Sequence, residues 1–259
     1  MNCLVLLRMV PDPVEELEVG PDGKSLDEAS VRLRAADTDE HALEEALLLK
    51  ERFGGAVTAV ALEAPEVDEA LFTALAKGAD RAVKLLTDVE NLGTVATART
   101  FASYLAGAGS LESAPLILTG SQSTDDWEGE LAACLAEALR LPYLGVVSGV
   151  SLVEGGRRVA VIKEFSAGFR GEYELPVPAV LGVQAAEKPP RYVPVARVRH
   201  VARTAKIETA PVPSPFKLTV LEVERMYKPQ PAGRAQMLDG SAEEIAERLA
   251  ELLAERGII

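Results

Sequence analysis

The feature that most constrains this fold is an alternation of short apolar runs with amphipathic segments between residues 3 and 142. Each apolar run suits a buried strand, and each segment that follows places apolar residues at helical spacing. We expect strands at 3–10, 56–62, 82–86 and 114–120, and helices within 35–55, 65–80, 91–106 and 118–142. Strands that alternate with helices in this way form a doubly wound, mostly parallel α/β sheet with helices on both faces.

The first helical segment shows recognisable start and stop signals. Asp37 or Thr38 is expected to cap its amino end, and Gly54 and Gly55 are expected to end it.

The rhythm changes after residue 143. Four β-like runs follow without a helical pattern between them: GVVSGVSLV, RRVAVIKEF, GEYELPV and PAVLGVQA. They predict an antiparallel or mixed extension of the sheet at about 143–185, within a nucleotide-binding-type domain over 1–185. Residues 186–215 are rich in proline and arginine and almost without periodicity, which predicts an arm or a partner-binding loop. A final amphipathic helix is expected from a Ser241 cap to Gly257, so that 186–259 forms an arm with a docking loop and a terminal helix.

Composition excludes several classes of function. The chain has 259 residues, is 48% hydrophobic and carries a net charge of −13, which argues against a nucleic-acid partner and against binding to anionic lipid. No apolar run is long enough to span a bilayer, and MNCLVLLRMVPDP is expected to be a first strand rather than a signal peptide. The isolated Cys3 and Cys134 suit a reducing cytoplasm, and only two histidines, His41 and His200, are available, so a histidine-rich metal site is excluded.

Ligands in a doubly wound sheet collect at the carboxyl ends of the strands. Three loops therefore matter, at 8–12, 62–65 and 120–129. Neither GxGxxG after the first strand nor GxxxxGK[ST] occurs, which disfavours a dinucleotide fingerprint and a Walker ATPase. The loop at 120–130 carries four carboxylates, on Asp125, Asp126, Glu128 and Glu130, at a helix amino end that would otherwise suit a phosphate.

Several stretches occur in the order and spacing of the electron transfer flavoprotein beta subunit, and the chain resembles that family over nearly its whole length. They are LVLLRMVPDP, TDEHALEEALLLKE, TALAKGADRAV, LTGSQSTDDWEGE, LPVPAVLGVQAAEKPPRY, KIE and AERLAELLAERGII. The resemblance implies a heterodimer with an alpha subunit that holds most of one FAD, and an AMP, or in some relatives a second FAD, in this chain. It implies a shuttle from flavin dehydrogenases, such as acyl-CoA dehydrogenases, to a membrane quinone reductase, with no catalytic residue of its own.

The resemblance also implies a set of cofactor-binding residues. The family's nucleotide loop reads like GxQxxDxDTGQ, and this chain matches it at Gly120, Gln122, Asp125 and Gly129 but has Glu128 and Glu130 where threonine and glutamine are usual. The candidates are Leu7, Arg8, Asp12, Leu62, Gly120, Gln122, Ser123, Asp125, Glu128, Gly129 and Glu130. Further departures from the family lie at 36–38 and 62–64.

The loop carboxylates leave alternatives open. They serve as helix caps beside an empty pocket, or AMP binds through backbone N–H groups with the glutamates turned outward, or one aspartate binds a ribose. Ionised glutamates only accept hydrogen bonds, so both glutamates weaken the expectation of a bound phosphate. Trp127 is a candidate cover for the pocket.

The arm at 188–206 matches the segment that carries the family's recognition loop for dehydrogenases. The docking candidates are Arg191, Tyr192 and Val195, the last at the position of the family's leucine anchor. The alternative is that the arm wraps on the alpha subunit.

Two rivals stay open. One is a universal-stress-type nucleotide-binding protein, which would be a colourless homodimer. The other is a bifurcating relative with a second FAD in this chain.

Overall fold

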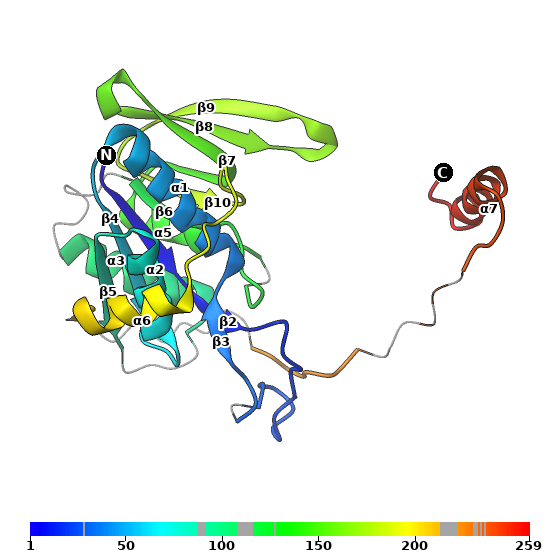
Figure 1. The fold of residues 1–259 in the computed structure, drawn as a ribbon, viewed down its shortest axis with the longest axis horizontal. Coiled ribbons are helices and arrows are strands. Elements are labelled where there is room, and N and C mark those ends of the chain that lie inside the picture. Colours follow the sequence, from blue (N-terminus) through cyan, green and yellow to red (C-terminus); the bar gives the residue numbers. More distant parts are fainter. Residues whose placement is uncertain are drawn as a thin grey trace. The chain divides into compact units, whose positions relative to one another are not determined.

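The computed structural model describes residues 1–27, 29–87, 92–107, 116–126, 128–212, 222–229, 233, 235 and 237–259. The described residues divide into two compact units, Met1–Met226 and Tyr227–Ile259. The larger unit holds the sheet and its helices, and the smaller one holds helix α7 (Ala242–Glu255) (Figure 1).

Among the described residues, nine strands form the main sheet in the order β11-β5-β4-β1-β6-β10-β7-β8-β9. Its central strands are β1 (Cys3–Leu7), β4 (Val57–Leu62), β5 (Arg81–Leu86), β6 (Leu116–Gly120) and β10 (Ala179–Val183), all parallel to their neighbours. The strand expected at 3–10 is interrupted after Leu7. Beyond that break, β2 (Met9–Pro11) pairs antiparallel with β3 (Leu33–Ala35) as a small separate sheet.

Helices cover both faces of the sheet, as expected (Figure 1). Side chains alternate across β1, so that Cys3, Val5 and Leu7 pack with α1 (Asp37–Phe53) and α2 (Val67–Lys77). Leu4 and Leu6 pack on the opposite face with α3 (Thr94–Gly107) and α5 (Leu131–Leu139). Residue 91 and residues 114–115, included in an expected helix and strand, lie outside the described residues. The doubly wound α/β fold is thereby confirmed.

The four β-like runs after residue 143 are also strands. They are β7 (Tyr143–Val153), β8 (Arg158–Glu164), β9 (Arg170–Pro176) and β10, and β7–β8 and β8–β9 are antiparallel pairs. Short turns at Glu154–Gly156 and Ser166–Gly168 join the antiparallel strands. The β8–β9 hairpin projects past the helical layers at the top of Figure 1. The mixed extension of the sheet is therefore confirmed.

The expectation of an irregular stretch over 186–215 is wrong for its described part. It contains helix α6 (Val195–Thr204) and strand β11 (Glu208–Pro211), which pairs parallel with β5. Helix α6 packs on α2, with only Val198 and Val201 among its valines partly buried. Arginines between these valines obscure the helical period, and β11 is held through its backbone, which no side-chain pattern reveals. Residues 213–215 lie outside the described part.

Helix α7 has the expected amino-terminal cap. The Glu244 backbone N–H donates to the Ser241 hydroxyl at 3.3 Å, and the Ser241 N–H donates to the Glu244 carboxylate at 2.8 Å. These reciprocal bonds satisfy two amide donors at the helix start. None of the helices in the described part of the chain has the length and apolar character that a membrane crossing requires.

Candidate functional site

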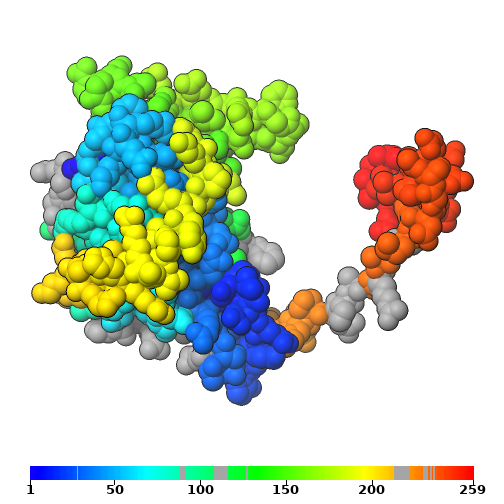
Figure 2. Space-filling view, in the orientation of Figure 1, coloured from blue at the N-terminus to red at the C-terminus, as the bar shows by residue number. Residues whose placement is uncertain are grey.

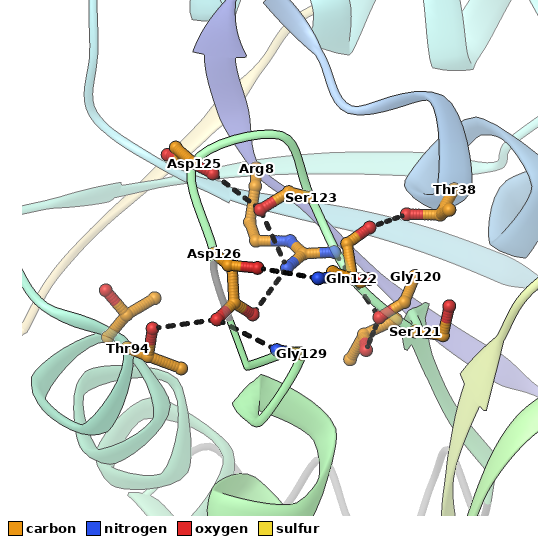
Figure 3. Close-up of polar contacts among 12 residues, drawn as sticks. Arg8, Thr38, Thr94, Gly120, Ser121, Gln122, Ser123, Asp125, Asp126 and Gly129 are labelled. Atoms are coloured by element: carbon orange, nitrogen blue, oxygen red, sulfur yellow. Dashed lines mark hydrogen bonds and ion pairs between the residues drawn. The ribbon is translucent and has the colours of Figure 1, made fainter. Parts of the chain in front are cut away.

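The sheet has its topological switch point between β1 and β6. From β1 the chain passes through α1 to β4 on one side, whereas β6 is the neighbour on the other side. Ligands bind beyond the carboxyl ends of strands at such a point. Here the strand ends are Leu7 and Gly120, which are followed by Arg8 and by the loop 121–130. Figure 3 shows Arg8 enclosed by that loop.

The Arg8 side chain, only 10% exposed, is held by the chain through its entire guanidinium group. Nε and Nη2 donate to Asp39 at 3.0 and 2.9 Å, and Nη2 also donates to the Gly120 carbonyl at 3.3 Å. Nη1 donates to Ser123 Oγ at 3.1 Å and to Asp126 at 3.4 Å. A guanidinium has five N–H donors, so every one of them has an acceptor in this chain.

The charge of Arg8 is stabilised where it lies. Burial by itself would lower the pKa of Arg8, but the nearby carboxylates, Asp39 foremost and then Asp126, outweigh burial and raise the pKa. Arg8 is therefore a permanent buried cation whose charge is balanced inside the protein.

Asp39 is the main counterion of Arg8. Its side chain is fully buried in the first turn of α1, where the helix dipole favours a carboxylate. Besides the guanidinium, the backbone N–H groups of Arg8 and Gly120 donate to it at 2.7 and 2.6 Å. Asp39 therefore ties the ends of β1 and β6 to the start of α1.

The end of β6 approaches α1 so closely that residue 120 must be glycine. A Cβ on Gly120 would lie 2.1 Å from Thr38 Oγ1 and 2.6 Å from Asp39 Oδ1. The Thr38 hydroxyl donates to the Gln122 carbonyl, and α1 has no side-chain cap. The expectation that Asp37 or Thr38 caps α1 is wrong, because Thr38 binds the loop instead.

Asp126 is the loop carboxylate that turns inward (Figure 3). It is 8% exposed, and its Oδ1 accepts from the Gly129 N–H at 3.2 Å and from Thr94 Oγ1 at 3.3 Å. Its Oδ2 faces Arg8 Nη1 at 3.4 Å. Thr94 is the first residue of α3 and Gly129 lies just before α5, so the carboxylate occupies the amino ends of two helices, where anions are favoured.

The other three carboxylates of the loop are exposed. Asp125 accepts a hydrogen bond from the Ser123 hydroxyl. Glu130 stands at the N-cap position of α5, but its side chain makes no capping hydrogen bond. Glu128 also points to solvent, and Trp127, the candidate cover, lies outside the described residues.

An open hollow of about 570 Å³ adjoins the loop. Its described lining residues are Asp37, Thr38, Gln122, Ser123, Thr124, Asp126 and Gln184, of which none is cationic and two are carboxylates. The neighbouring cation, Arg8, has all its donors on the chain. A nucleotide phosphate is bound most strongly by cationic donors, whereas this lining offers neutral amides and hydroxyls beside two carboxylates, so the described side chains fit AMP poorly.

The structure brings only part of the expected cofactor set together. Arg8, Gly120, Gln122, Ser123 and Gly129 lie at the switch point with Asp125. Leu7 is buried in the core, and Leu62 is partly buried against the opposite face of the sheet. Asp12 lines a separate hollow of about 290 Å³ between the β2–β3 pair and α2, together with residues that include Arg32, Arg34, Glu40 and Lys77.

The cofactor-binding candidates from the sequence did not include Asp39, Thr94 or Asp126, all of which complete the site. One signal was available, because Arg8 interrupts an otherwise apolar run and a buried arginine requires a counterion. This pattern indicates that Arg8 has a carboxylate partner but does not identify which residue supplies it.

The docking candidates lie on a segment that α1 holds in place. The Arg191 guanidinium binds Glu44, with Nη2 at 2.8 Å, and binds Glu51 through Nη1 at 2.7 Å. Tyr192 is 84% exposed and Val195, the first residue of α6, is 58% exposed. Figure 2 shows this yellow segment lying on the surface of the larger unit.

Two further side chains of α1 hold the same segment. Glu45, fully buried, accepts from the Val150 N–H at 2.9 Å and from the Glu187 N–H at 3.0 Å. His41 Nδ1 accepts from the Ala186 N–H at 3.2 Å. Helix α1 therefore fixes the path of the chain between β10 and α6.

The fold and its switch-point loop define a doubly wound α/β protein of the nucleotide-binding type. A family model described as "Electron transfer flavoprotein domain" matches residues 24–215. The "Electron transfer flavoprotein subunit beta" of Methylophilus methylotrophus is 28% identical over 266 residues, covering 98% of each chain. That of Clostridium acetobutylicum is 33% identical over 200 residues, covering 76% of this chain and 74% of the relative. The "Caffeyl-CoA reductase-Etf complex subunit CarD" of Acetobacterium woodii is 26% identical, and the match covers 100% of both chains.

This chain belongs to the electron transfer flavoprotein beta-subunit family. The family role is electron transfer in association with a flavin, and a beta subunit of this family pairs with an alpha subunit.

Proposed function

We propose that this chain is the beta subunit of a heterodimer that takes electrons from flavin dehydrogenases, such as acyl-CoA dehydrogenases, and delivers them to a membrane quinone reductase. The observation that carries the proposal is the match to a beta subunit over 98% of both chains. In this proposal FAD is held mainly by the alpha subunit and supplies the redox chemistry, while this chain forms one wall of the site and binds the partners.

The alpha subunit is proposed to dock on the β8–β9 hairpin. Phe165, Phe169 and Tyr173 are 46%, 71% and 41% exposed on this hairpin. A Cβ on Gly171 would lie 2.8 Å from the Tyr173 ring and 3.1 Å from the Phe165 ring, so those two rings meet over the glycine. Exposed aromatic residues grouped in this way are typical of the central part of a protein–protein interface.

Helix α7 offers a second contact for the alpha subunit. Its Ile245, Leu249 and Leu252 recur at spacings of four and three residues and so lie on one face of the helix. In the unit Tyr227–Ile259 none of the helix residues is buried, and Leu249 is 49% exposed. An isolated apolar stripe of this kind suits a groove on a partner protein.

The donor dehydrogenase is proposed to dock on α6 and the residues before it. Tyr192 and Val195 supply exposed apolar area, while Arg197, Arg199 and Arg203 add positive charge that suits an acidic partner surface. Arg191 contributes differently, because its guanidinium is bound to Glu44 and Glu51 and so positions the segment. Exposed apolar area within a charged surface fits a transient docking contact.

The loop 121–130 supplies the proposed wall of the flavin site. Gln122 and Asp125 are exposed there, whereas Arg8 and Asp126 are turned inward.

We place the chain in the cytoplasm. The described lining of the hollow has no cationic side chain for the pyrophosphate of a second FAD and carries two carboxylates, which favours the one-FAD heterodimer over the bifurcating type.

The test is purification of the chain under native conditions, with co-purifying chains identified by mass spectrometry and the visible spectrum recorded. We expect a yellow complex with an alpha subunit whose flavin is reduced anaerobically by an acyl-CoA dehydrogenase and its substrate. A colourless homodimer that carries ATP would overturn the proposal in favour of a universal-stress-type protein.

A further inference from the structure

The switch point contains the elements from which proteins build phosphate sites. The amino ends of α3 and α5 converge there, represented by the Thr94 hydroxyl and the Gly129 N–H, and the Arg8 guanidinium lies beside them. Helix amino ends and an arginine fork are the donors that phosphate binding uses. Each of these three donors points at one atom group, the Asp126 carboxylate.

We propose that Asp126 is a resident anion that closes the phosphate site of this chain, so that the chain binds neither AMP nor the pyrophosphate of a second FAD. Its carboxylate takes the place that a phosphate would occupy, with three contacts of 3.2, 3.3 and 3.4 Å.

The rest of the cluster keeps Asp126 in that place. Arg8 cannot turn toward a ligand without leaving Asp39, which is fully buried and would lose its counterion. The Gln122 side-chain amide donates to the Asp126 carbonyl at 3.2 Å, and the Asp126 N–H donates to the Ser123 carbonyl at 3.2 Å. Both backbone groups of Asp126, its N–H and its carbonyl, are therefore hydrogen-bonded within the loop.

The charges in the adjoining hollow also oppose the binding of a phosphate. The hollow is lined by the carboxylates of Asp37 and Asp126 with no cationic side chain among its described lining residues, and Asp125 lies on the same loop. A phosphate placed there meets like charge and finds Arg8 already neutralised. The ion-paired cluster of Arg8, Asp39 and Asp126 thus holds β1, α1, β6, α3 and the loop together without a nucleotide.

The experiment begins with the wild-type complex. Nucleotides are released by mild denaturation, which leaves FAD unhydrolysed, and AMP and FAD are counted separately by chromatography. We expect no AMP. One AMP per chain would overturn the inference. The FAD count tests the proposed flavin function in the same sample, so failure of one is distinguishable from failure of the other.

Isothermal calorimetry with AMP, and separately with inorganic phosphate, then tests the role of Asp126. Wild type is expected to show no saturable heat. Asp126→Ala removes the resident carboxylate, and Asp126→Asn removes its charge but keeps its shape. We expect saturable binding of AMP or phosphate to appear with Asp126→Ala, at least tenfold tighter than any binding to wild type.

Two matched controls change exposed carboxylates of the same loop that do not contact Arg8 directly. Asp125→Ala and the double variant Glu128→Thr/Glu130→Gln are expected to behave as wild type. Saturable AMP binding to wild type, or an equal gain in the controls and in Asp126→Ala, would overturn the inference. If Asp126→Ala does not fold, Asp126→Asn replaces it in the calorimetry. The AMP count of the wild-type complex tests the inference without any variant.

Discussion

The Asp39 carboxylate accepts three hydrogen bonds from Arg8, from its backbone N at 2.7 Å, from Nε at 3.0 Å and from Nη2 at 2.9 Å. The two residues are 31 positions apart in the sequence; Asp39 is fully buried and the Arg8 side chain is nearly so. This pair joins the first strand of the sheet to its first helix, at the place where proteins of this architecture bind ligands.

The first prediction concerns the stability that this pair provides. Asp39→Asn removes the main counterion of the Arg8 charge and leaves only Asp126, at 3.4 Å, to balance it, so we expect the free energy of unfolding to fall by about 3–5 kcal/mol. The measurement is urea unfolding followed by circular dichroism.

Asp37→Asn is the matched control, since Asp37 lies on the same turn of α1 and pairs with Arg34 at the surface. An exposed pair contributes little, so the control should lose less than about 1 kcal/mol. Equal losses in the two variants would contradict the assigned role of Asp39.

The second prediction uses two adjacent glutamates whose pKa values are shifted in opposite directions. Burial raises the pKa of Glu45 from 4.5, with Glu187 adding to the rise and Arg52 and the backbone amides opposing it. The stability that Glu45 contributes is therefore complete below pH 4.5 and is lost as the pH rises through its raised pKa. Relative to Glu45→Gln, the wild type should therefore lose unfolding free energy as the pH rises over that range.

Glu44 is the matched contrast. Burial would raise its pKa, but the hydrogen bonds from Arg191 prevail and lower it below 4.5. The stability that Glu44 contributes is present above pH 4.5 and is lost as the pH falls through its lowered pKa. Urea unfolding of Glu44→Gln and Glu45→Gln across this pH range should show opposite trends relative to wild type. The same trend in both would contradict the assigned environments.

The third prediction tests donor docking on α6. Val195→Ala removes exposed apolar area at the proposed contact, so the KM for the donor dehydrogenase should rise about fivefold, the equivalent of roughly 1 kcal/mol. Flavin content should not change, because Val195 lies outside the switch-point cluster. Val198→Ala, on the side of α6 that packs toward α2, should leave the KM unchanged. An unaltered KM for Val195→Ala would remove this residue from the docking site.

The fourth prediction tests the interface with the alpha subunit. Phe169→Asp places a charge on the exposed β8–β9 hairpin, and we expect affinity for the alpha subunit to fall by about 2 kcal/mol, roughly thirtyfold. Dissociation of the complex would be followed by analytical ultracentrifugation. Phe53→Asp, at the exposed end of α1, serves as the control and should keep wild-type affinity. If Phe169→Asp also keeps wild-type affinity, the hairpin is not the interface.

The fold was largely predictable because the core of a parallel sheet is apolar on both faces. Leu4 and Val5 lie on opposite faces of β1 and are both buried, so the strand reads as a continuous apolar run. Helix α6 escaped prediction because it is only half packed and its exposed side is basic.

The site was less predictable because its contacts are distant in the sequence. The loop 120–130 was identifiable from its position after a strand, but Arg8 and Asp126 are 118 residues apart. Four carboxylates in one loop look alike in the sequence. Only the convergence of α3, α5 and β1 distinguishes Asp126, which is buried, from Asp125 beside it, which is exposed.

The most direct test of the proposed electron shuttle is the number of FAD molecules in the purified complex of this chain with its alpha subunit, measured by absorbance after release and normalised to each chain. We expect one FAD per heterodimer. Two FAD molecules would contradict it and point to a bifurcating complex, and a complex without FAD would contradict the proposed electron shuttle altogether.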